Sequence, residues 1–222
     1  MLRLALALYA EGDTDHQFLP TIIQRTSRHL CERHSLRNVD VLSIESIMIR
    51  KAGLKQDERI LLAARAADKS HALIIHADAD DHTPEKALRE RFQPGYERVQ
   101  QLDANVCKNL VPIVPVRMTE AWMLADPDAL QEVIKIDIKP LELGLPKKAK
   151  QVELYADPKQ TLRQMVQKAY AHKTRRQRYM SIEYLYEALA REIRLDRLAE
   201  VPAYQRFVSD LTLVLRTLNF IQ

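Results

Sequence analysis

Four short apolar segments in the first half of the chain restrict its fold more than any other feature. They cover residues 4–9, 39–44, 72–77 and 111–116. Their apolar side chains fall at both odd and even positions, which is typical of strands buried on both faces of a parallel sheet. Longer segments separate them, as the crossovers between parallel strands require. We therefore expect an α/β fold with a four-stranded, mainly parallel sheet flanked by helices.

The segments between these strands carry the apolar spacing of helices. The predicted helices cover residues 14–30, 56–68 and 85–102. In the third, Pro94 and Gly95 predict an interruption, because proline removes a backbone donor and glycine weakens a helix.

The second half of the chain changes in character, because no strand pattern follows residue 116. Helical patterns cover residues 119–124, 128–134, 159–170, 181–193 and 204–218, with a Pro- and Lys-rich connection at 140–150. We expect an α/β domain at residues 1–118 and a helical C-terminal region at residues 119–222 that packs on it.

The composition excludes a disordered chain and a protein with a glycine-rich nucleotide-binding loop. Of the 222 residues 46% are hydrophobic, which is enough for a packed core and excludes disorder of the whole chain. There are only four glycines, and neither glycine-rich nucleotide-binding motif is present. The 34 Lys and Arg residues against 30 Asp and Glu residues give a net charge of +4. This mild excess permits a polyanionic partner without requiring one.

The cysteine content and the apolar segments bear on the compartment. Cys31 and Cys107 cannot build a disulfide framework, which favours a reducing compartment. The apolar residues 1–10 run directly into an acidic segment without a convincing cleavage site, so we predict a buried strand there and not a signal peptide. No apolar run approaches the roughly 20 residues of a membrane-spanning helix. We therefore expect a cytoplasmic protein with no membrane partner.

Acidic residues follow two of the predicted strands. Glu11 comes directly after the first strand, and Asp78, Asp80 and Asp81 come after the third. In an open α/β sheet the ligand lies beyond the carboxyl ends of the strands, so these carboxylates would meet there if the strands are neighbours. Hard oxygen ligands without a thiolate suit Mg²⁺ or Mn²⁺. The alternative is that they cap helices or lie in solvated loops.

These residues carry a resemblance to a known family. A strand followed by Glu11-Gly12 and Thr14-Asp15, then a strand that ends in Asp78-Ala79-Asp80, resembles the Toprim domain of topoisomerases, bacterial primases and OLD-family nucleases. The segment 115–126, Pro-Val-Arg-Met-Thr-Glu-Ala-Trp-Met-Leu-Ala-Asp, is similar to an uncharacterised Toprim-like family related to the OLD-family nucleases. Members of that family are often encoded near ATPases in bacterial defence loci. His76 departs from the pattern, since that strand position is usually apolar.

The resemblance implies a divalent-metal site with hydrolytic chemistry. It assigns metal binding to Glu11, Asp78 and Asp80, with Asp15 as a further ligand, and Mg²⁺ or Mn²⁺ as the cofactor. The metal would activate a water and stabilise the phosphoryl oxygens. Glu120, just after the fourth strand, is a further catalytic candidate that would complete a second metal site or position a water. Its alternative role is that of an acidic residue at the start of a helix.

Two basic segments are candidates for contacts with nucleic-acid phosphates. The residues are Lys147, Lys150, Lys173, Arg175, Arg176 and Arg178. A solvated basic face is the alternative. A nuclease would also use a lysine to stabilise its transition state, and Lys147, Lys150 and Lys159 are candidates that the sequence does not rank.

Two functions from different classes follow. The leading expectation is a Mg²⁺-dependent nuclease of the Toprim type that cleaves phosphodiester bonds in DNA or RNA, acting in phage defence with an ATPase partner. The alternative is a non-catalytic Toprim module that binds nucleic acid or a partner protein. The intact acidic residues favour the enzyme, because a binding module could lose them without penalty.

Overall fold

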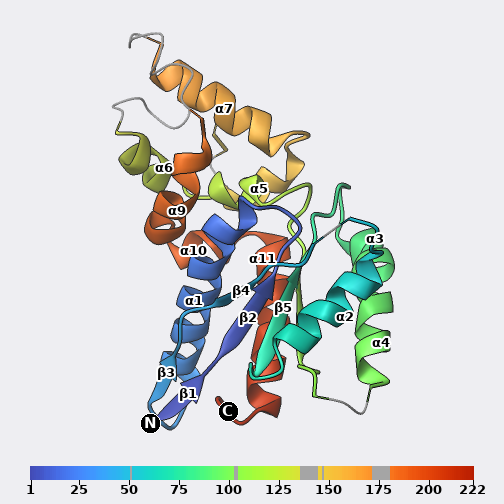
Figure 1. Ribbon diagram of the computed structural model, residues 1–222. Helices are drawn as coiled ribbons and strands as arrows, with labels where there is room; N and C mark the ends of the chain where they lie inside the picture. The colour runs from blue at the N-terminus through green and yellow to red at the C-terminus, as the bar shows by residue number, and fades with distance from the viewer. Residues whose placement is uncertain (51, 103–104, 136–144, 147, 172–180) are drawn as a thin grey trace.

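A parallel sheet lies at the centre of the fold (Figure 1). The computed structural model describes residues 1–50, 52–102, 105–135, 145–146, 148–171 and 181–222. Within these ranges the four-stranded sheet has the order β4-β2-β5-β6, and every neighbouring pair is parallel. The strands are β2 (Leu6–Tyr9), β4 (Glu45–Ile47), β5 (Ala72–His76) and β6 (Leu110–Ile113). The predicted α/β class and parallel sheet are confirmed.

The first predicted strand, residues 4–9, is divided in two, and the second, residues 39–44, ends before β4 begins. β1 (Leu2–Leu4) pairs with β3 (Val39–Val41) in a separate two-stranded sheet, and the same chain segments continue as β2 and β4. The division falls at Ala5, whose backbone N–H donates to the Nδ1 atom of His71 at 3.0 Å. The backbone N–H of His71 in turn donates to the Ala5 carbonyl. A side chain therefore takes the place of a strand partner at this point.

Both faces of the sheet are covered by helices, as the apolar strands predict. Leu6, Leu8 and Ile74 point to the face that packs against α1 (Asp15–His34) and α11 (Pro202–Thr217). The alternate side chains belong to a second core cluster with α2 (Gln56–Ala66) and α4 (Gln93–Gln100) on the opposite face; they are Ala7, Tyr9, Leu73 and Ile75. Because side chains alternate along a strand, burial of both faces requires the continuous apolar runs seen in the sequence.

The third predicted helix continues through its expected interruption. It consists of α3 (Glu85–Ala87), a π-helical turn η1 (Leu88–Phe92) and α4. The N–H of Gln93 donates to the carbonyl of Leu88, five residues earlier. The prediction of a break at Pro94 and Gly95 is wrong, because the wide turn lies just before Pro94 and places this proline at the start of α4, where a missing N–H is tolerated.

The C-terminal region is helical throughout the part that the structure describes. Its elements are α5 (Glu120–Met123), α6 (Pro127–Ile134), the 3₁₀ helix η2 (Ala149–Leu154), α7 (Pro158–Ala169), α9 (Glu183–Glu192), α10 (Leu195–Leu198) and α11. The three longest predicted helices of this region are found within a few residues of their expected bounds, whereas η2 and α10 were not predicted.

One hydrophobic cluster joins this region to the sheet. α9 packs against α1, and α11 packs against β6. Trp122 is fully buried in the cluster and meets the ring of Tyr204 edge-on, with the ring centroids 5.3 Å apart. Trp122 is therefore a core residue and not a surface for stacking bases. Whether residues 1–118 form a separate domain stays a prediction.

No helix of the described ranges is both long enough and apolar enough to cross a bilayer.

Candidate functional site

The acidic residues singled out from the sequence meet at one edge of the sheet. β2 pairs directly with β5, and β5 with β6, so the carboxyl ends of these three strands are neighbours. Glu11 follows β2, Asp78 and Asp80 follow β5, and Glu120 begins α5 after β6. α5 and α7 lie beyond this end of the sheet (Figure 1). The expected convergence of the strand ends is thus present.

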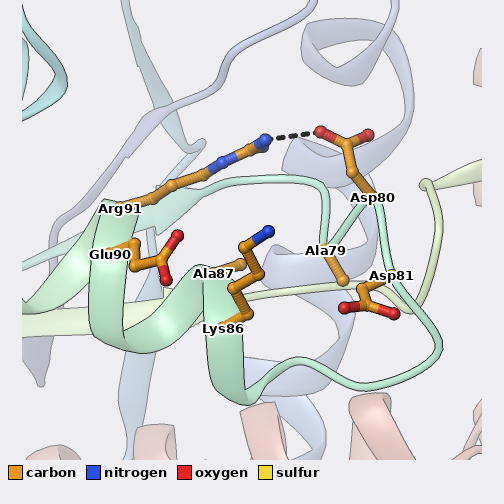
Figure 2. Close-up of a pocket in the computed structure, with 7 residues that line it drawn as sticks. All are labelled: Ala79, Asp80, Asp81, Lys86, Ala87, Glu90 and Arg91. Atoms are coloured by element: carbon orange, nitrogen blue, oxygen red, sulfur yellow. Dashed lines mark hydrogen bonds and ion pairs between the residues drawn. The ribbon is translucent and has the colours of Figure 1, made fainter.

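The guanidinium of Arg91 joins three of these residues. Its Nη1 atom lies 3.4 Å from the Glu11 Oε2 atom and donates to the Asp78 backbone carbonyl at 2.8 Å. Its Nη2 atom donates to the Asp80 Oδ2 atom at 2.5 Å, the contact drawn in Figure 2. Arg91 belongs to the π-helical turn η1. A cationic side chain of the protein therefore lies among the carboxylates.

A buried histidine lies between the side chains of Asp78 and Asp15. His76, the last residue of β5, is fully buried, with its Nε2 atom 3.3 Å from the Asp78 Oδ1 atom and its Nδ1 atom 3.5 Å from the Asp15 Oδ2 atom. The hydroxyl of Thr119 lies 3.1 Å from the same Nε2 atom. Burial alone would lower the pKa of His76, but the carboxylates of Asp15 and Asp78 outweigh it and raise that pKa.

Gly12 is required by the position of Asp15. The Asp15 Oδ2 atom accepts a hydrogen bond from the Gly12 backbone N–H at 3.0 Å. A Cβ atom on Gly12 would lie 2.5 Å from that same oxygen, so any larger residue would push the carboxylate away. The glycine of the Glu11-Gly12 motif thus fixes the first turn of α1 against the strand end.

The electrostatic environment of the site favours a bound cation. Burial raises the pKa of Glu11, and the charges of Asp78 and Asp80 add to that rise against the opposing effects of Arg91 and His76. Burial also raises the pKa of Asp78, with Asp15 and Glu120 raising it further and His76 opposing them. The ionised carboxylates are therefore destabilised where they stand, and an additional positive charge would relieve this.

The helical region supplies a second part of the site. Glu120 is buried and accepts a hydrogen bond from the hydroxyl of Tyr186 on α9. The Nζ atom of Lys159, near the start of α7, lies 3.0 Å from the Glu120 Oε1 atom. The Asp157 side chain caps α7 by accepting the Gln160 N–H at 2.8 Å, which fixes the turn that carries Lys159. Glu120 thus connects the strand ends to two helices of the C-terminal region.

Two residues with left-handed backbone shape the loops at the ends of β5 and β6. Asp80 has φ 52° and Arg117 has φ 65°, and the Asp80 N–H donates to the Arg117 carbonyl at 3.4 Å. Left-handed backbone is uncommon outside glycine, and it clusters at functional sites. This conformation turns the Asp80 side chain back toward Arg91, as Figure 2 shows.

A small hollow lies beside the acidic residues (Figure 2). Its volume is about 180 Å³, and it is bordered by the loop after β5 and by the first turns of α3 and η1. The residues that line it are Ala79, Asp80, Asp81, Lys86, Ala87, Glu90 and Arg91. The ammonium of Lys86 points into this space, between Arg91 and Asp81.

The oxygen donors of the site match a divalent metal in their chemistry but not in their spacing. The groups offered by Glu11, Asp15, Asp78 and Asp80 are hard oxygens, which suits Mg²⁺ or Mn²⁺. The Asp78 Oδ1 atom is buried and makes no well-oriented hydrogen bond, although His76 lies within ion-pair distance. Within the described ranges no three His, Cys, Asp or Glu side chains are gathered tightly enough to hold a metal. Arg91 and His76 lie between the carboxylates, so the residues fit in chemistry and would have to close up around an ion.

The predicted basic residues are placed only in part. Lys150 is exposed on η2, and Lys159 contacts the site. The other five candidates lie outside the described residues; they are Lys147, Lys173, Arg175, Arg176 and Arg178.

Three residues of the site could not be assigned a role there from the sequence pattern. Nothing in the local pattern marks Arg91 or Tyr186, because their contacts with Glu11 and Glu120 depend on tertiary structure. His76 was noticed only as a polar residue in an apolar strand. That signal, a titratable residue at the carboxyl end of a buried strand, could have placed it in the site.

Fold and site together define an α/β protein with an acidic site at the carboxyl edge of a parallel sheet. Residues 10–212 match a protein family described as a domain of unknown function (DUF4276), and the chain belongs to that family. No curated protein and no solved structure matches the chain.

Proposed function

We propose that this chain is a divalent-metal-dependent nuclease with a site of the Toprim type. The observation that carries the proposal is the meeting of Glu11, Asp78 and Asp80 at the ends of two paired strands. Their order along the chain, with Glu11 after the first strand and an Asp-x-Asp motif after a later one, is that of the Toprim pattern.

Each acidic residue has a role in this proposal. Glu11, Asp78 and Asp80 bind Mg²⁺ or Mn²⁺, and Asp15 contributes from the first turn of α1. The metal, when bound, lowers the pKa of a water and neutralises charge on the phosphoryl oxygens.

Glu120 and Lys159 act on the side of the site formed by the helical region. Glu120 is held by Tyr186 and Lys159 close enough to Asp78 to raise the pKa of that carboxyl, so it can position a water. Lys159 is the preferred candidate for stabilising the negative charge that develops on the phosphate, because it already lies at the site.

Nucleic acid, DNA or RNA, is the proposed substrate. Sequence-independent binding comes mainly from Lys and Arg contacts with phosphates, and the two basic segments named from the sequence would supply them. An ATPase partner, a role in phage defence and a cytoplasmic location remain predictions of the resemblance.

One observation favours the second candidate function, a non-catalytic module. The carboxylates are already paired with Arg91 and with His76, so the acidic cluster is partly neutralised by the protein itself. A module that binds nucleic acid or a partner protein without cleavage would need no metal.

A cleavage assay separates the two candidates. The purified protein is incubated with single- and double-stranded DNA and RNA in Mg²⁺, Mn²⁺ or EDTA. We expect cleavage that depends on the metal, is lost in Glu11→Gln and Asp78→Asn, and is retained in Asp13→Asn, an exposed carboxylate in the same loop as Glu11. Binding without cleavage, unaffected by EDTA and by these substitutions, would instead identify the non-catalytic module.

A further inference from the structure

Arg91 makes more contacts with the acidic site than a surface ion pair would require. One guanidinium contacts the Glu11 and Asp80 carboxylates and the Asp78 carbonyl, at 3.4, 2.5 and 2.8 Å. These oxygens come from the ends of two different strands. The Arg91 side chain is 34% exposed and that of Glu11 is 25% exposed, so the contact lies at the mouth of the site, where an ion from solvent can reach it.

The helix that carries Arg91 is shaped to make this contact. Arg91 lies in the π-helical turn η1, where the backbone bonds run from Gln93 to Leu88. Such turns are rare and are frequent at functional sites. Its neighbour Arg89 is 69% exposed and pairs with the adjacent Glu90. The turn therefore separates two nearby arginines, of which one reaches the strand ends and one faces solvent.

A guanidinium and a divalent ion would compete for these carboxylate oxygens. Mg²⁺ requires oxygens at about 2.0–2.1 Å in octahedral geometry, and the Asp80 oxygen that would serve it now bonds Arg91. Two positive charges so close would also repel each other. We propose that Arg91 is a resident cation that the divalent metal must displace, so that this residue sets the metal affinity of the site. The inference rests on the proposed metal-dependent function.

Because Arg91 and the metal compete for the same oxygens, each weakens the contacts of the other. In the absence of metal the guanidinium offsets the repulsion among the carboxylates and stabilises the fold. When metal binds, part of its binding free energy is used to break these contacts. The observed metal affinity is therefore lower than that of the same site without Arg91. Coupling between two bound species typically changes affinity 5- to 150-fold.

Removal of the resident cation tests the proposal. The full chain and its Arg91→Gln variant are titrated with Mn²⁺ by calorimetry, and their melting temperatures are measured with and without the metal. We expect Arg91→Gln to bind Mn²⁺ about tenfold more tightly, within the usual range of such coupling. It should melt at a lower temperature without metal and gain more from adding it. The matched control Arg89→Gln should behave as the wild type.

A second variant keeps the test decisive if Arg91→Gln folds poorly. Arg91→Lys retains the charge but cannot bridge both carboxylates with a fork of donors, so its Mn²⁺ affinity should lie between those of the wild type and Arg91→Gln. Near-UV circular dichroism checks the fold of each variant. Unchanged or weaker Mn²⁺ binding in folded Arg91 variants would overturn the proposal and make Arg91 a scaffold of the site.

The same titration distinguishes this inference from the proposed function. Glu11→Gln is measured in both backgrounds. Mn²⁺ binding that needs Glu11 but is indifferent to Arg91 would refute the inference and leave the metal site standing. If neither the wild type nor the Arg91 variants bind Mn²⁺ through Glu11, both the metal-dependent function and the inference are wrong.

Discussion

At the residue scale, the pKa values of two carboxyl groups of this protein, Asp78 and Asp126, are shifted in opposite directions. Asp78 lies where burial and the neighbouring acids raise its pKa, so its charged form costs stability. Asp126 is fully buried, yet its pKa is lowered, because hydrogen bonds and the charge of Arg194 outweigh the effect of burial. The first arrangement is typical of a binding site, the second of a structural ion pair.

Asp78→Asn should stabilise the metal-free protein. The raised pKa means that the folded state binds a proton more tightly than the unfolded chain, so stability falls as the pH rises through that pKa. Asparagine removes this cost, and the melting temperature at neutral pH should rise by a few degrees, at about 2–4 °C per kcal/mol. The gain should vanish in acid. Thermal melts in EDTA across a pH series measure it, and a lower melting temperature would show that Asp78 is structural.

Asp126→Asn should destabilise the protein by about 2 kcal/mol or more. This value lies between the stability usually lost with a helix cap and that lost when one partner of a buried ion pair is removed. Asp126 caps α6 through the Ala129 N–H and accepts from the backbone and side chain of Arg194. Its lowered pKa makes this contribution full at neutral pH and lost as the pH falls through that pKa. Urea denaturation checks this. The control Asp128→Asn, an exposed partner of the same arginine, should cost less than about 1 kcal/mol.

At the scale of elements, the contact between α2 and α4 depends on a residue that the sequence marked as a helix breaker. Gly95 lies inside α4, where its missing side chain lets the backbone approach Ile60. A Cβ atom there would lie 2.6 Å from the Ile60 Cδ1 atom and 2.7 Å from its Cβ atom. Gly95 therefore allows α4 to pack closely against α2.

Gly95→Ala should lower stability by about 1–3 kcal/mol through overpacking, reduced by the roughly 1 kcal/mol gain in helix propensity. Ile60→Ala leaves space at the same contact. The double variant should lose less stability than the sum of the losses in the two single variants, and the difference, the coupling energy, should be about 0.5–3 kcal/mol. Chemical denaturation of the four proteins measures this coupling. Strict additivity would mean that the helices shift apart at no cost.

The elements also show what the sequence could and could not predict. The strands were predictable because β5 and its neighbours are buried on both faces, and the meeting of Glu11 with Asp78 followed from the rule for strand ends. The break at Ala5 depends on the His71 side chain, which comes from a distant segment. The position of Arg91 depends on a π-helical turn, and no local signal predicts such a turn.

At the scale of the whole molecule, the sheet and the C-terminal helices share one core. Phe18 and Ile22 of α1 belong to the same cluster as Tyr186 of α9 and Phe207 of α11. Removing the helical region would expose the part of the sheet face that α11 covers and the side of α1 that packs against α9. Apolar surface of this extent is rare on stable monomers.

A fragment of residues 1–118 should therefore fail to fold as a stable monomer. We expect a broad, non-cooperative thermal transition and binding of a hydrophobic dye, because packing against α9 and α11 is lost. Circular dichroism melts and size-exclusion chromatography measure this beside the full chain. A monomeric fragment with a sharp transition would establish residues 1–118 as a separate domain.

The contacts of Glu120 also have a consequence for the order of synthesis. The ribosome delivers the chain from its N-terminus, so Glu11, Asp78 and Glu120 emerge before Lys159, and Tyr186 emerges last of these five. A nascent or prematurely terminated chain carries the acidic residues but lacks the lysine and tyrosine that hold Glu120 in place. Any activity that depends on this arrangement can begin only after Tyr186 has emerged from the ribosome.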